Sequence, residues 1–83
     1  MITDTRDIIK IVLKNNYKKI YLAHSENIRA EGIARNIKDT LSKKGIECFV
    51  GADYRKKGEE AIRKAIEEAE VLFTISIEEG IAG

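Results

Sequence analysis

The segment Ile20–Glu26, Ile-Tyr-Leu-Ala-His-Ser-Glu, constrains the fold of this chain more than any other. An apolar run ends there abruptly in polar residues, and a long amphipathic segment follows. A buried strand that leads into a helix through a polar turn is typical of the beginning of a parallel α/β unit. In such folds, ligands and partners are met at the carboxyl ends of the strands. The sequence therefore directs attention to His24, Ser25 and Glu26.

Three segments have the apolar periodicity of helices. The first covers residues 4–15, with Thr3 or Asp4 as its cap, and ends at two asparagines, which tolerate left-handed backbone. The second covers residues 25–44, with Ser25 or Asn27 as its cap and a glycine after its last turn. The third begins at Gly58 and carries two glutamates at its positive end. In the first segment the residues that recur at helical spacing are Thr5, Ile8, Ile9, Val12 and Leu13. The predicted core-facing stripe of the second is Ala30, Ile33, Ala34, Ile37 and Leu41, and the predicted buried face of the third is Ile62, Ala65, Ile66 and Ala69.

Three apolar runs between these helices are predicted strands, at Lys18–Ala23, Ile46–Val50 and Val71–Ile77. A polar loop is expected over Gly51–Lys57. The last run is apolar almost throughout, as in a strand that is covered on both faces.

The order of elements predicts one α/β domain over residues 1–83, with a helix at 1–16 and a βαβαβ core at 18–77. Right-handed crossovers with the first strand in the middle give a three-stranded parallel sheet of order 2-1-3 and helices on both faces. The first helix should then pack beside the second. One edge of the third strand stays open, so we expect pairing between two copies or coverage by a partner.

The composition narrows the class of protein. The 83 residues suit one small domain, and 15 basic against 14 acidic residues argue against general nucleic-acid binding. Cys48 is the single cysteine, so neither an internal disulfide nor a zinc cluster is expected. No apolar run approaches the ~20 residues that span a bilayer, which favours the cytoplasm. The lysine- and glutamate-rich composition, which lacks glutamine, tryptophan and proline, suggests a thermophilic source as a hypothesis.

Polar residues after the first and third strands form a candidate ligand site at the switch point of the sheet. His24 is a candidate acid or base, since histidine is the residue type most used for proton transfer, but a hydrogen-bonded structural histidine is the commoner case. Ser25 is expected to act as a helix cap, because neighbouring side chains on a strand diverge and His24 cannot serve it as a base. The amides of the following helix can bind an anion, although no glycine-rich phosphate motif is present. The candidate ligand-binding residues are His24, Ser25, Asn27, Ser76 and Glu79, with Glu78 beside them.

A compact basic turn precedes the third helix. Tyr54-Arg55-Lys56-Lys57-Gly58 can clamp a phosphate or meet an acidic partner surface. An exposed loop that charge merely keeps soluble is the alternative. Cys48 alternates with Ile46 and Val50 and is expected in the core.

At these positions the chain resembles the N-terminal half of a TIR (Toll/interleukin-receptor) domain, from about Lys18 to Ser76. Lys19–Glu26 resembles the first box of that family, and Gly45–Val50 resembles its second strand. Asp53–Gly58 resembles the loop after that strand, and Ala65–Ser76 resembles the next helix and strand.

The resemblance implies a homotypic interaction module in signalling or defence, in which Asp53, Tyr54, Arg55, Lys57 and Gly58 form the contact loop. Some members hydrolyse NAD, but their catalytic glutamate lies beyond the point that matches Ser76, and Glu78 and Glu79 come too early to match it. We therefore expect no catalytic residue, metal or resident cofactor, and a second copy or another protein as partner.

Two alternatives stay open. One is the binding of NAD or an ADP-ribose-type nucleotide, or NAD hydrolysis, at the strand ends. The other is a phosphotransferase IIB-like protein, an inactive fragment or an idealised design. The IIB proteins share the strand–loop–helix opening but carry a cysteine at the end of the first strand, where this chain has Ala23-His24-Ser25.

Overall fold

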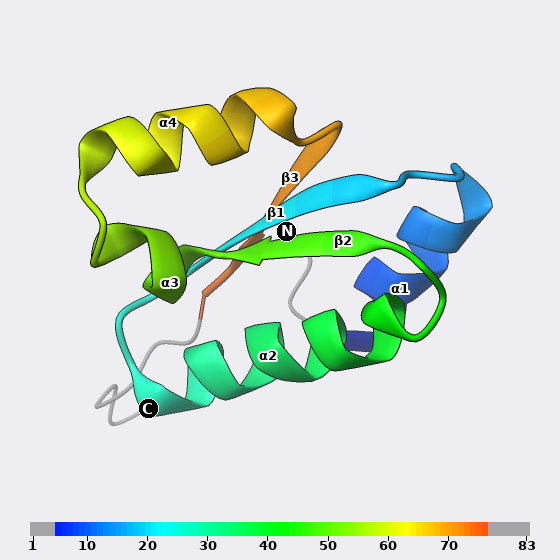
Figure 1. Cartoon of the computed structure of the whole chain (residues 1–83). Helices are drawn as coiled ribbons and strands as arrows, with labels where there is room; N and C mark the ends of the chain where they lie inside the picture. Colours follow the sequence, from blue (N-terminus) through cyan, green and yellow to red (C-terminus); the bar gives the residue numbers. More distant parts are fainter. Residues whose placement is uncertain (1–4, 77–83) are drawn as a thin grey trace.

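Three parallel strands form the centre of the computed structural model, which describes residues 5–76 (Figure 1). The central strand β1 (Lys19–His24) pairs with β2 (Glu47–Val50) on one side and with β3 (Val71–Ile75) on the other. The predicted order 2-1-3 and the parallel direction of all three strands are confirmed.

Helices cover both faces of this sheet (Figure 1). On one face, α1 (Thr5–Lys14) packs beside α2 (Ile28–Ser42). On the other face lie α3 (Gly51–Arg55) and α4 (Glu59–Glu68). The two crossovers, β1 to β2 through α2 and β2 to β3 through α4, therefore use opposite faces, as right-handed connections require. The predicted contact between the first two long helices is confirmed.

Two hydrophobic clusters hold these layers together. Alternate residues of β1 serve them in turn, because successive side chains of a strand point to opposite faces. Ile20 and Leu22 belong to the larger cluster, with α1 and α2, and Tyr21 belongs to the smaller one, with α4. Cys48 lies in the larger cluster as a free, buried thiol, as predicted.

Local backbone signals in the sequence agree with the structure at the helix ends. Asn16, after α1, has a φ of 58°, and Gly45, after α2, has a φ of 80°. Both lie in the left-handed region that asparagine and glycine tolerate best. At the other end of α2, the cap is Asn27, whose side chain accepts the Ala30 N–H at 2.7 Å. The sequence had left Ser25 and Asn27 as alternatives.

The expected polar loop over residues 51–57 is wrong, because α3 follows β2 directly at Gly51. The N-cap residue of α3 is Val50, which offers no side-chain hydrogen bond. Its role is taken by His24, whose Nε2 accepts the Ala52 N–H at 3.0 Å. Only glycine fits easily at residue 51, since a Cβ there would lie 3.3 Å from the Leu22 carbonyl oxygen. A tertiary contact thus caps the start of a helix that the local sequence does not predict.

The prediction that the third strand is covered on both faces is also wrong. Phe73 and Ile75 are buried in the larger core, but Leu72 and Thr74, on the opposite face, are exposed. α4 packs on α3 and β1 instead. One reason is that α3 brings Tyr54 into the smaller cluster with α4, which draws the helix towards the β2 side of the sheet.

Candidate functional site

The turn between β1 and α2 is ordered by its own polar groups. The Ser25 N–H donates to the Ile75 carbonyl oxygen at 3.0 Å, which extends the pairing of β1 with β3. Asn27 Nδ2 donates to Ser25 Oγ at 3.2 Å, while Asn27 Oδ1 caps α2. Both predicted site residues thus help to build the turn.

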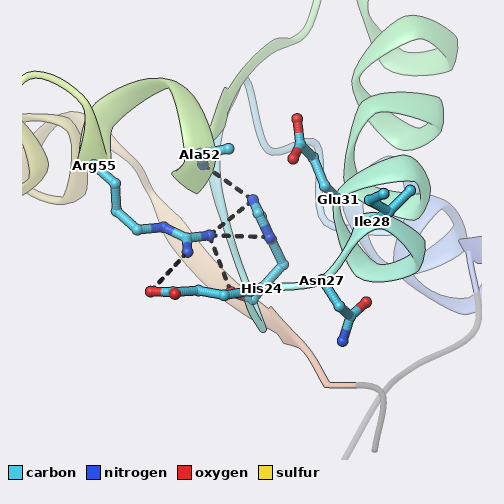
Figure 2. A pocket seen from close by; sticks show the side chains of 7 residues that line it. His24, Asn27, Ile28, Glu31, Ala52 and Arg55 are labelled. Atoms are coloured by element: carbon cyan, nitrogen blue, oxygen red, sulfur yellow. Dashed lines mark hydrogen bonds and ion pairs between the residues drawn. The ribbon is translucent and has the colours of Figure 1, made fainter. Parts of the chain in front are cut away.

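His24 is held on both ring nitrogens (Figure 2). Nε2 accepts the Ala52 N–H at 3.0 Å, an arrangement that favours the tautomer with its proton on Nδ1. Nδ1 lies 3.0 Å from the Ser25 carbonyl oxygen, a suitable acceptor. Because the basic lone pair is occupied by a backbone amide, His24 is poorly placed to act as a general base and well placed to join β1 to α3.

Arg55 packs against this histidine from α3 (Figure 2). Its Nη2 lies 3.1 Å from Nδ1 and 3.3 Å from Nε2 of His24, and donates to the His24 carbonyl oxygen at 3.3 Å. Its Nη1 pairs with Glu26 Oε2 at 3.1 Å. The carboxylate of Glu26 is largely exposed, so this ion pair is weak and open to competition by another anion.

These side chains border a hollow of about 280 Å³ between the start of α2 and the start of α3. Besides predicted residues, it includes residues that the sequence analysis missed. Among these, Ile28 is 88% exposed, unusually high for a large apolar side chain. The sequence contained one indication that Ile28 is exposed, namely its position outside the apolar stripe of α2. The hollow is lined by His24, Glu26, Asn27, Ile28, Glu31, Ala52 and Arg55.

The remaining ligand-binding candidates lie elsewhere. Ser25 and Ser76 are not among the residues that line the hollow, although both follow strand ends. Glu78 and Glu79 lie outside the described residues. The structure thus brings His24, Asn27 and Arg55 together at one end of the sheet.

The side chains of the predicted contact segment 53–58 contact different parts of the protein. Asp53 binds Arg35 of α2, with Oδ1 3.0 Å from Nη2, and this hydrogen-bonded guanidinium lowers the pKa of the Asp53 carboxyl. Tyr54 packs edge-on against Phe49, at 5.7 Å between ring centroids, and burial raises the pKa of its phenol. Lys57 Nζ lies 5.0 Å from the centroid of the Tyr54 ring.

Gly58 has a φ of 105° and forms the N-cap of α4. Glycine suits this backbone conformation, which L side chains rarely adopt. The segment is therefore a helix and a tight turn with structural contacts, and Arg55 is its member that lines the hollow.

Two further properties concern residues 5–76. No group of three metal-ligating side chains gathers in this part of the chain. No helix among the same residues is long and apolar enough to cross a membrane. Comparison with protein-family models, with curated proteins and with solved structures finds no match.

Proposed function

We propose that this protein is a small interaction module that self-associates through the edge of β3 that faces away from β1, an edge with which no other strand among residues 5–76 pairs. The observation that carries the proposal is the state of that edge. β3 lies at one edge of the sheet, and neither β3 nor Ser76 after it has a charged side chain. Natural proteins protect such edges with charges, proline, bulges or a covering element. An edge of this kind is suited to pairing with another strand.

Apolar side chains beside the edge support the same proposal. Leu72 is 44% exposed on the α4 face of β3, and Ile66 of α4 is 40% exposed. The right-handed turn of α4 and the right-handed crossover together place Ile66 on the side of the helix that overlooks β3. We call Leu72, Thr74 and Ile66 the edge surface.

A concave region lies beside the edge surface. A hollow of about 310 Å³ runs along the same flank of α4 and is lined by Glu59, Ile62, Arg63, Ile66 and Glu67. An apolar strip with a charged border is the usual composition of an association surface.

The likeness of residues 18–76 to the first half of a TIR domain supports a signalling or defence role for this module. The parallel 2-1-3 sheet is compatible with that likeness. That the chain is related to the TIR family is part of this proposal.

Sedimentation tests self-association. The wild type should form dimers or larger assemblies at micromolar concentration. Leu72→Lys should weaken association at least about tenfold, which is about 1.4 kcal/mol, because a lysine on an edge strand opposes pairing. Leu13→Lys is the matched control, since Leu13 is 42% exposed on α1, in the opposite layer. A wild type that stays monomeric at high concentration contradicts the proposal.

A second candidate function is the binding of a phosphate-bearing ligand in the hollow beside His24. Arg55 supports it, because its exposed partner Glu26 can be displaced by a competing anion at the positive end of α2. A hollow of about 280 Å³ admits a phosphate with part of a ribose rather than a whole dinucleotide. Millimolar NAD or ADP-ribose should shift the amide resonances of Asn27 and Ala52 saturably. Unmoved resonances eliminate this candidate.

A further inference from the structure

We infer that two copies of this chain pair their β3 strands in antiparallel orientation. The two-fold axis of this dimer passes midway between the two copies of Phe73. The inference rests on the proposed self-association and specifies its geometry. It begins with the direction of the backbone groups. The Ser25 N–H donates to the Ile75 carbonyl oxygen, so Ile75 uses its carbonyl towards β1.

The groups that point outward follow by alternation. In a parallel ladder, every second residue of a strand bonds to the same neighbour. Phe73 and Ile75 therefore bond to β1, and at the start of the pairing the Glu70 N–H donates to the Lys19 carbonyl oxygen at 2.8 Å. The N–H and C=O groups of Leu72 and Thr74 point away from β1. Each copy thus offers two donors and two acceptors at its free edge.

Two identical edges with this pattern can satisfy each other in only one direction. In a parallel pair, a residue whose N–H and C=O point towards the partner strand lies beside a residue whose groups point away. A two-fold axis along the strands places identical residues side by side, so it cannot give this pattern. An antiparallel pair requires two residues of the same kind opposite each other, which exchange both hydrogen bonds. Two copies of one edge provide this, and the resulting symmetry is closed.

The register follows from the centre of the strand. β3 covers five residues with Phe73 in the middle. An axis at Phe73 overlaps the full strand and sets Leu72 of each copy opposite Thr74 of the other. All four outward groups of each strand are then paired, and the two sheets form one sheet of six strands.

The same arrangement brings the two copies of the edge surface together on one face of the joined sheet. An axis perpendicular to the sheet keeps both α4 helices on one face. Three strand spacings separate the two β1 strands, about 14 Å, and a helix with its side chains is about 10–12 Å wide. The two copies of Ile66 then lie on the helix flanks that overlook the central strands, above the Leu72–Thr74 pairs.

The charges at this edge permit a second copy as the occupant. The segment 71–76 has no charged residue, so two copies approach without like-charge repulsion between the paired strands. The border of the surface on α4 carries both signs, with Arg63 between Glu59 and Glu67, which moderates repulsion between the two helices.

Cysteine cross-linking of the full chain tests the register. In the inferred dimer, residue 72 of one copy lies about 5.5 Å (Cα to Cα) from residue 74 of the other, within the range for a disulfide. The distance between the two copies of residue 72 is about 7–8 Å, beyond that range. Cys48 does not interfere, because it is buried and its thiol pKa is raised to about 11.

A mixture of Leu72→Cys and Thr74→Cys chains should therefore oxidise to a disulfide-linked dimer, whereas each variant alone should give little. Preferential cross-linking of either variant with itself overturns the register. Variants that sediment as dimers without cross-linking overturn the edge pairing but leave self-association standing. Variants and wild type that all sediment as monomers overturn the proposed function itself.

Discussion

Replacing His24 by methionine removes the acceptor that the Ala52 N–H uses at the start of α3. The net contribution of a hydrogen bond to stability is about 1 kcal/mol, and a buried donor left unpaired costs about 1–3 kcal/mol. Ala52 is only partly buried and borders the hollow, so water can reach part of this site. We therefore expect a loss near the low end, about 1 kcal/mol. For a domain of this size that lowers the melting temperature by about 4–8 °C.

His24→Gln is the matched control, because glutamine has nearly the shape of methionine and returns an oxygen acceptor near the position of Nε2. Urea unfolding followed by circular dichroism gives the free energy of unfolding of both variants. The glutamine variant should be the more stable by about 1 kcal/mol. Equal stabilities would refute the argument that a side-chain acceptor replaces the missing cap of α3.

Three further predictions concern stability. Asn27→Ala should cost about 0.5–2 kcal/mol and Asn27→Ser much less, because only alanine lacks a capping oxygen; equal losses in urea unfolding would exclude the cap as the cause. Asp53→Asn should cost at most about 1 kcal/mol in thermal melts, since both side chains of the Asp53–Arg35 pair are partly exposed to solvent. The pKa of Asp53 is lower in the folded state than in the unfolded chain, so the wild type keeps this advantage at neutral pH and loses it as acid protonates Asp53; an advantage that persists in acid contradicts the assignment. Leu41→Ala should cost about 2–5 kcal/mol in denaturant unfolding, because Leu41 is fully buried in the larger core, and a loss under about 1 kcal/mol is too small for such a site.

Hydrophobic periodicity and turn residues were sufficient to predict the sheet. The stripe from Ala30 to Leu41 predicted α2, and Gly45 marked its end with the positive φ that the structure contains. The apolar run before His24 predicted β1, and handedness then fixed the order of the strands. These signals are local or follow from general rules, so one sequence carries them.

Features that depend on tertiary contacts were not predictable. α3 begins without a capping side chain of its own, and its acceptor comes from His24, a residue 28 positions earlier. The apolar composition of β3 suggested burial on both faces, but the exposure of Leu72 depends on where α4 lies. Local sequence contains neither fact.

The candidate site was predicted in part for the same reason. Parallel strands brought the end of β1 and the segment after β2 to one edge, so His24, Asn27 and Arg55 meet as their strand-end positions suggested. Glu31 and Ala52 were missed, since their contribution depends on how α2 and α3 approach each other.

Amide hydrogen exchange at Leu72 and Thr74 tests edge pairing most directly. These two N–H groups point away from β1, so a strand that pairs with this edge should protect them. Protection of both should rise with protein concentration in parallel with the fraction of dimer, while the Phe73 amide, bonded to β1, stays protected throughout. Rapid exchange at Leu72 and Thr74 in a fully dimeric sample would contradict pairing through the β3 edge.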